Sequence, residues 1–183
     1  MKVQMSSRTM GDVDGTNERW LTPDELDAWM HYVATSTLLE SALDRQLQRD
    51  SGMPHAYYQI LAMLSEVPNR TLRMSDLAAV TQSSQSRLSH AVSRLERNGW
   101  VQRMPCADDR RSTLAHLTEA GFTALAAAAP GHVRTVREHL FDKLTCEQVG
   151  QLRAILSTVL SGLAEEGGPV PMPGVAARQD APA

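Results

Sequence analysis

The segment SSQSRLSHAVSRLERNGW, residues 83–100, combines a helical period with two unlike faces. Leu88, Val92 and Leu95 recur every three or four residues and form one apolar face. The opposite face carries serines, a histidine and arginines, and the segment contains a single acid, Glu96. A solvated surface helix favours Glu and Lys instead. The pattern therefore predicts an amphipathic helix whose polar face is built from short hydroxyl side chains and arginine.

The residues on either side predict a helix-turn-helix followed by a β-hairpin. Ser84 is suited to cap the helix, and Gly99 is suited to end it. A short helix over residues 75–80 comes first, separated by a short turn. Residues 100–104 and 112–117 are expected to form two strands joined by a charged loop. This order of elements is typical of a winged helix-turn-helix.

The residue types on the polar face suit contact with duplex DNA. A major groove about 12 Å wide admits one helix, and short side chains let its axis come close to the bases. Serines can hydrogen-bond phosphates or base edges, and arginine or histidine reaches deeper acceptors such as guanine O6 and N7. Arginines of the hairpin can lie along the DNA backbone or enter the adjacent minor groove.

The charge distribution agrees with a local DNA-binding surface on an acidic protein. The whole chain of 183 residues has a net charge of −3. Residues 83–111, however, contain six arginines and three acids, and so carry +3. Arg103, within this stretch, is interpreted as flanking positive charge. Such a basic stretch on an acidic body is an electrostatic footprint of a nucleic-acid partner.

The flanking segments predict further helices. Thr22, Pro23 and Glu25 form a capping box at the start of a first long helix. A second helix is expected over residues 55–65, and a fifth after Thr118, kinked or interrupted near Pro130. The sixth helix carries an apolar seam with a seven-residue period, formed by Val149, Leu152, Leu156, Val159 and Leu163. This seam needs a partner, either within the chain or in a second copy.

Composition and motifs argue against several other classes of protein. Aromatic residues make up only 4% of the chain, which favours an aliphatic, helical core. Cys106 and Cys146 lack metal-ligand spacing and fit reduced thiols in the cytoplasm. There is no apolar run long enough for a membrane span and no export signal. We find no catalytic motif, metal cluster or cofactor loop, so no enzyme, metal or cofactor is expected.

Residues 86–121, SRLSHAVSRLERNGWVQRMPCADDRRSTLAHLTEAG, resemble the multiple-antibiotic-resistance regulator (MarR) family. The family's wing pattern, D-x-R followed by a hydrophobic position and L-T-x-x-G, is present as Asp109, Arg111, Leu114, Leu117, Thr118 and Gly121. The R-L-E-x-x-G-W-V ending of its recognition helix is present as Arg94, Leu95, Glu96, Gly99, Trp100 and Val101. Together and correctly spaced, these two motifs are fairly specific.

The resemblance implies a mainly α fold with a small β-hairpin wing: six helices, of which the first, fifth and sixth build an obligate homodimer. The expected organisation is a flexible arm over residues 1–20, a dimerisation helix over 21–54, a winged helix-turn-helix lobe over 55–118, C-terminal dimerisation helices over 119–164 and a disordered tail over 165–183.

The resemblance also implies which residues lie near DNA. They are Ser84, Gln85, Ser86, Arg87, Ser89, His90, Arg94, Arg110 and Arg111. It implies that Arg111 enters the minor groove and that Asp109 orients the wing. Many members carry a basic residue where this chain has His90, which predicts weaker or pH-sensitive binding. Arg94 has a competing interpretation, as an ion-pair partner of Glu96 or Asp109.

The family resemblance further implies a small aromatic or lipophilic effector that releases the protein from a pseudo-palindromic operator, as for a repressor. Aromatic and histidine side chains in neighbouring helices are the expected lining, with core packing as the competing interpretation: Trp29, His31, His55, Tyr57 and Tyr58.

Two alternatives to an effector-released repressor stay open. A thiol at the base of the wing, Cys106, would make the chain a redox-sensing regulator. Against this, the peroxide-sensing members carry their cysteine near the start of the first helix, where this chain has none. The balanced charges at the wing tip leave open a protein–protein interaction module that does not bind DNA.

Overall fold

A computed structural model describes residues 19–106, 109 and 112–167. The chain divides into two compact units, residues 1–35 and 36–183. Among the described residues, none of the helices combines the length and apolar character that a membrane span requires.

The first unit contains the N-terminal half of α1 (Pro23–Ser51), which begins with the predicted capping box. The backbone N–H of Thr22 donates to Glu25 Oε2 at 2.7 Å, and that of Glu25 donates to Thr22 Oγ1 at 3.2 Å. The Arg19 guanidinium also donates to Glu25, at 3.0 Å. These hydrogen bonds, chiefly the one from the Thr22 backbone, lower the pKa of the Glu25 carboxyl.

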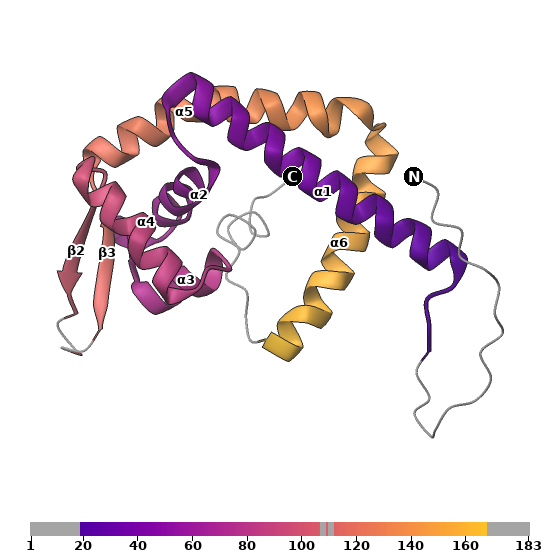
Figure 1. Ribbon diagram of the computed structural model, residues 1–183, viewed down its shortest axis with the longest axis horizontal. Helices are drawn as coiled ribbons and strands as arrows, with labels where there is room; N and C mark the ends of the chain where they lie inside the picture. Colours follow the sequence, from indigo (N-terminus) through magenta and orange to yellow (C-terminus); the bar gives the residue numbers. More distant parts are fainter. Residues whose placement is uncertain (1–18, 107–108, 110–111, 168–183) are drawn as a thin grey trace, which may run out of the picture. The chain divides into compact units, whose positions relative to one another are not determined.

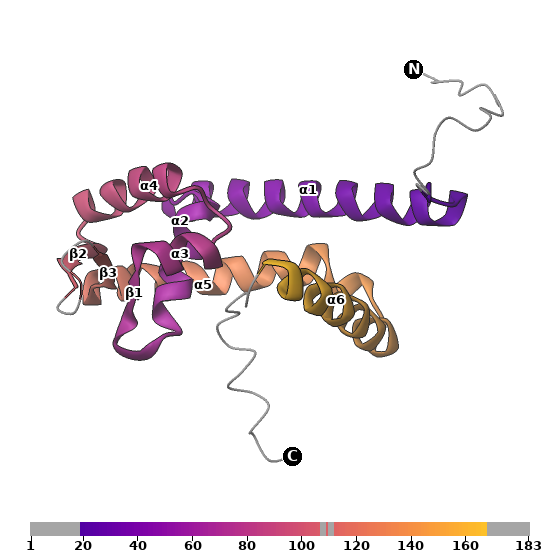
Figure 2. The same ribbon diagram turned by 90° about the horizontal axis from the view of Figure 1, so that it is seen from below.

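The second unit continues α1 (Figure 1), and its described residues add five helices and a three-stranded antiparallel sheet in the order β1-β3-β2 (Figure 2). The helices are α2 (His55–Ser65), α3 (Met74–Val80), α4 (Gln85–Arg97), α5 (Glu119–His139) and α6 (Cys146–Gly167). The strands are β1 (Thr71–Arg73), β2 (Val101–Pro105) and β3 (Thr113–Leu117), and short 3₁₀ turns cover Pro68–Arg70 and Phe141–Lys143. The predicted mainly α winged helix-turn-helix is confirmed.

Three local features differ from the sequence-based expectation. Strand β1 was not foreseen, because three residues are too few to show a period; it forms by pairing with β3, and Figure 2 shows it beside α3. Helix α5 continues through Pro130 without interruption, with Ala128 and Thr135 buried on either side of the proline. Helix α6 runs to Gly167, three residues into the expected tail, because the first helix-breaking proline comes only at residue 169.

The remainder of both expected termini, residues 1–18 and 168–183, lies outside the described residues.

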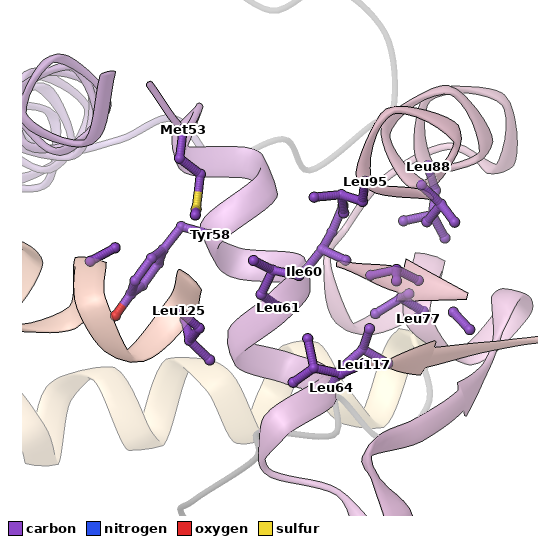
Figure 3. Packing of buried hydrophobic residues seen from close by; sticks show 14 of the residues in the cluster. Met53, Tyr58, Ile60, Leu61, Leu64, Leu77, Leu88, Leu95, Leu117 and Leu125 are labelled. Atoms are coloured by element: carbon purple, nitrogen blue, oxygen red, sulfur yellow. The ribbon is translucent and has the colours of Figure 1, made fainter. Parts of the chain in front are cut away.

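The core of the second unit forms where α2, α3, α4, β3 and α5 meet (Figure 3). Leu88, Val92 and Leu95 of α4 are at most 1% exposed, and they pack with Leu61 and Leu77 from α2 and α3. The apolar face predicted for residues 83–100 is therefore the inner face of α4. Its polar face is held outward by the same packing.

The end of α4 is joined tightly to the start of α5. Gly99 takes a positive φ of 71°, its N–H donates to the Glu96 carbonyl at 2.9 Å, and that of Trp100 donates to the Leu95 carbonyl at 2.9 Å. The Thr118 hydroxyl, which caps α5, donates to the Gly99 carbonyl at 2.7 Å. A Cβ on Gly121 would collide with the Trp100 carbonyl. The family-pattern glycine is thus required by the close approach of two backbone segments.

We expect Gly121→Ala to lower the free energy of unfolding by about 1–3 kcal/mol, because the added methyl group must displace backbone rather than a side-chain end. Denaturant unfolding at a fixed protein concentration measures this. Gly150→Ala is the matched control, since its Cβ would meet nothing within 4 Å and the change favours a helix. Equal stability of the Gly121→Ala and Gly150→Ala variants would show that this junction is not tightly packed.

Candidate nucleic-acid interface

The outer face of α4 presents the predicted polar residues to solvent. The exposed residues of this face and its cap are Ser84, Gln85, Ser86, Arg87, Ser89, His90 and Arg94. Ser84 also has a structural role, because its Oγ accepts the Arg87 backbone N–H at 3.3 Å and so caps the helix. All seven residues predicted here are therefore accessible from solvent.

A groove of about 520 Å³ runs beside this face. It is lined by residues of β1 and α3, of α4, and of the hairpin, namely Arg73, Met74, Ser75, Gln85, Ser86, Ser89, Arg103, Ser112 and Thr113. The groove brings predicted α4 residues together with hydroxyl groups from two other elements. Hydroxyls with arginine in a concave site suit a chain of phosphates.

Arg73 is a member of this groove that sequence reasoning missed. It lies at the end of β1, a strand too short to be foreseen, so no periodic signal placed it near α4. Among the described residues it forms no ion pair, and its side chain lines the groove. An unpaired cation in a groove of hydroxyls is a suitable partner for a DNA phosphate.

Asp109 forms hydrogen bonds within the hairpin at its loop end, between β2 and β3. The Ser112 hydroxyl donates to Asp109 Oδ2 at 2.7 Å, and the Ser112 N–H donates to the Asp109 carbonyl at 2.9 Å. Arg110 and Arg111 lie outside the described residues, so their contact with DNA stays a prediction. The role of Asp109 in orienting the wing is also a prediction, and these two hydrogen bonds are compatible with it.

The ion pair that Glu96 forms differs from the pair with Arg94 that the sequence suggested. Glu96 pairs with Arg103 at 2.8 Å, whereas Arg94 is exposed on the outer face. Arg103 therefore has a defined partner and is more than the flanking positive charge that the sequence indicated. The sequence signal for this contact was the spacing of four and three residues between Ser89, Ser93 and Glu96, which places them on one face of α4. Arg103 contacts this face only when β2 folds back on α4.

Two of the expected effector-lining residues belong to the first unit. Trp29 is 52% exposed and stacks on Tyr32 with ring centroids 5.9 Å apart. The His31 Nδ1 lies 2.8 Å from the Asp27 carbonyl and 3.3 Å from Asp27 Oδ2. Both contacts are within one helix and give no indication of a ligand.

The other three belong to the second unit, and two of them form a cluster with His132 of α5. His55 stacks on His132 with centroids 5.6 Å apart, and the Tyr58 ring lies 4.3 Å from the His132 ring. Tyr57 is half-buried against the core. Among the described residues, the buried Nδ1 atoms of His55 and His132 have no hydrogen-bond partner. Sequence reasoning missed His132 because the contact joins α2 to a distant helix.

Burial governs the titration of this cluster. It lowers the pKa of His55, although Glu40 and Asp44 act in the opposite direction. It lowers the pKa of His132, and His55 lowers it further. Burial also raises the pKa of the Tyr58 phenol. Both histidines are therefore held in their neutral form near pH 7.

The two thiols of the described part of the chain differ in exposure: Cys106 is buried, whereas Cys146, the first residue of α6, is exposed. Cys106 is 7% exposed at the end of β2, and buried thiols of this kind are usually inert. Within those residues, no group of three or more His, Cys, Asp or Glu side chains is placed to hold a metal ion.

Comparison with known proteins agrees with this geometry. A sequence model described as "MarR family" matches residues 51–112. The crystal structure of Sco3205, a MarR family transcriptional regulator from Streptomyces coelicolor in complex with DNA, is 51% identical with a TM-score of 0.76; the match covers 81% of this chain and 93% of that one. The structure of AbsC, a MarR family regulator from the same organism, is 39% identical with a TM-score of 0.74, covering 81% and 99%.

A curated relative, the transcriptional repressor MprA of Escherichia coli, is 27% identical over 128 residues, which is 70% of this chain and 71% of the relative.

We expect the stability of the protein to fall as the pH drops below about 6.5, the usual pKa of histidine. The pKa values of His55 and His132 are lower in the folded than in the unfolded protein, so the unfolded chain takes up protons first as the pH falls. The resulting contribution to stability is fully present above the unfolded-state pKa, and it is lost as the pH falls through the folded-state pKa values. Denaturant midpoints between about pH 8 and pH 5 measure the slope. His132→Phe, which keeps a ring beside Tyr58, should flatten it, and an equal slope in both proteins would contradict this assignment.

Proposed function

Because the chain belongs to the MarR family of transcriptional regulators, we propose that it binds a pseudo-palindromic duplex operator as a homodimer and represses transcription until a small effector releases it. The observation that carries this proposal is the exposed serine- and arginine-rich face of α4 beside the groove that holds Arg73.

DNA contact is supported by the chemistry of this surface. Gln85 and Arg87 sit in the first turn of α4, at the end that enters a major groove in helix-turn-helix proteins, and both are exposed. Ser86 and Ser89 are short enough to let the helix approach the bases. The relative Sco3205, at 51% identity, is described in complex with DNA, which supports the same partner here.

A homodimer is supported by the apolar seam of α6, which a single chain leaves uncovered. Leu156, Val159 and Leu163 are 46%, 54% and 59% exposed. They follow a seven-residue period, so they lie on one stripe of the helix. A second copy would bury this stripe and present two α4 helices about 34 Å apart, one turn of DNA.

Repression and release by an effector are the finer parts of the proposal. The relative MprA is described as a repressor, which supports the sign of regulation. The effector is proposed to be a small aromatic or lipophilic molecule. His55, Tyr58 and His132 support it by bringing rings together with buried nitrogen atoms that lack a partner among the described residues.

The decisive experiment is selection of bound fragments from random duplex DNA by the purified protein, followed by sequencing. We expect an enriched pseudo-palindrome whose half-sites are one helical turn apart. Failure to retain any duplex at low salt would contradict the proposal and favour a protein–protein interaction module. Enrichment that is lost on mild oxidation and preserved in Cys106→Ser would instead favour the redox-sensing alternative.

We predict that Arg111→Ala weakens binding to enriched and random duplexes alike and lowers the log–log salt slope by about 0.9, the value for one released phosphate. Gln85→Ala should instead weaken only the enriched sequence, by about 1–3 kcal/mol, because a base contact is lost. Salt titrations of the two variants on both duplexes measure the difference. Binding of Arg111→Ala that matches the parent would contradict the wing assignment.

A further inference from the structure

We infer that Arg103 is a positioning residue: it fixes the hairpin to the recognition helix α4 and presents the Ser89 hydroxyl as a hydrogen-bond donor to DNA. This inference rests on the proposed DNA-binding function. It assigns to Arg103 a role that needs no contact with DNA.

The Arg103 guanidinium is shared among three residues of a single α4 stripe. Its Nη1 donates to Ser93 Oγ at 2.9 Å and to Glu96 Oε2 at 2.8 Å. Its Nη2 donates to the Ser89 carbonyl at 2.7 Å and to Ser89 Oγ at 3.1 Å. Residues four and three apart share one helix face, so a single planar fork spans two turns of α4.

The main chain of Arg103 is held by the same carboxylate. Strand β2 lies at the edge of the sheet, so an N–H pointing away from β3 has no strand partner. The Arg103 N–H donates instead to Glu96 Oε1 at 3.0 Å. Glu96 thus binds both the backbone and the side chain of Arg103, and the hairpin cannot slide along α4 without breaking both hydrogen bonds.

The network also determines what Ser89 offers to a ligand. Ser89 Oγ accepts from the guanidinium, and within the described part of the chain its hydroxyl serves only as an acceptor. Its proton is therefore available for an acceptor on a ligand, such as a phosphate oxygen or a purine N7. Ser89 is exposed and lines the groove that also contains Arg73, so the donor faces the surface where DNA is proposed to bind.

Arg103 and Arg73 line the same groove but differ in their partners. Arg103 is engaged by four acceptor atoms and only 27% of its side chain is exposed. Arg73 forms no ion pair with any described residue. A phosphate contact therefore falls to Arg73, and its loss should appear in the salt dependence, whereas the loss of Arg103 should not.

The test compares Arg103→Met, Arg103→Lys and Glu96→Gln on two probes, the duplex enriched by the parent protein and a random-sequence duplex of equal length. All three variants should weaken binding to the enriched duplex about tenfold with an unchanged salt slope. Lysine keeps the charge but cannot reach Ser89, Ser93 and Glu96 together. Arg73→Met should lower the slope by about 0.9 on both probes.

Glu96→Gln discriminates best between two explanations, because a pure charge effect and a positioning effect predict opposite changes in affinity for the enriched duplex. Removing an acid from a DNA-facing lobe should tighten binding if charge alone matters. It should weaken binding to the enriched duplex if Glu96 holds Arg103 in place. The substitution is nearly isosteric, and thermal unfolding checks that each variant is folded at the assay temperature.

Two controls separate positioning from a general loss of structure. Arg70→Met breaks an ion pair of equal length, 2.8 Å to Glu119, and should leave the ratio of enriched to random affinity unchanged. Ser89→Ala combined with Arg103→Met should bind no more weakly than the weaker of the two single variants, because Arg103→Met removes the orientation of the same hydroxyl that Ser89→Ala deletes.

Parent-like affinity of Arg103→Lys and Glu96→Gln for the enriched duplex would overturn the inference. So would a fall in salt slope for Arg103→Met that equals the fall for Arg73→Met, or additive effects of Ser89→Ala and Arg103→Met. If the parent protein itself binds no duplex, the proposed function fails instead, and that result is distinct from these.

Discussion

Burial of the apolar stripe of α4 is the constraint on which the proposed DNA-binding surface depends. Leu88, Val92 and Leu95 are almost fully buried, and complete burial of each such side chain contributes about 1.5–3 kcal/mol. Because these residues repeat at helical spacing, their burial also fixes the rotation of the helix about its axis. The serines and arginines on the other side have no comparable packing, so this core determines that they face outward.

Two geometric variables define the proposed DNA-binding surface. One is the rotation of α4 about its axis, and the other is the position of the hairpin. Three separate sets of hydrogen bonds fix the hairpin, one within it and two to α4. Asp109 closes its distal end through Ser112, Arg103 and Glu96 attach β2 to α4, and Thr118 joins β3 to the end of α4 through Gly99. Each set uses a polar side chain on an exposed or edge position, where backbone N–H and C=O groups would otherwise lack partners.

Local patterns in the sequence were sufficient to predict the helices and their ends, but they were insufficient to predict the contacts between distant elements. The capping box at Thr22, the Ser84 cap and the ending at Gly99 all depend on residues within a few positions, and all are confirmed. Strand β1 and the Arg73 that follows from it depend on pairing with β3, about forty residues away, which no local period reports. The His55–His132 stack was missed for the same reason.

The same distinction between local patterns and distant contacts applies to the residues of the candidate site. Periodicity placed the α4 face correctly, because a helix face is a local property of 13 residues. It could not show that Arg103 pairs with Glu96, because the arginine and the acid come from different elements. A count of positive charge therefore overstated the number of cations available to DNA, and gave no indication of how Ser89 is oriented.

Helix α5 is the element through which an effector would have to act. It begins at Glu119, directly after its cap Thr118, which is hydrogen-bonded to the end of α4. Some thirteen residues or about 20 Å later, it carries His132 against α2. A ligand releases DNA only if it binds more tightly to the arrangement that does not fit the operator. A molecule that moved His132 relative to Tyr58 would move one end of a helix whose other end supports both α4 and the hairpin. The coupling therefore requires no contact between effector and DNA-facing residues, only that α5 transmit the shift as a rigid body.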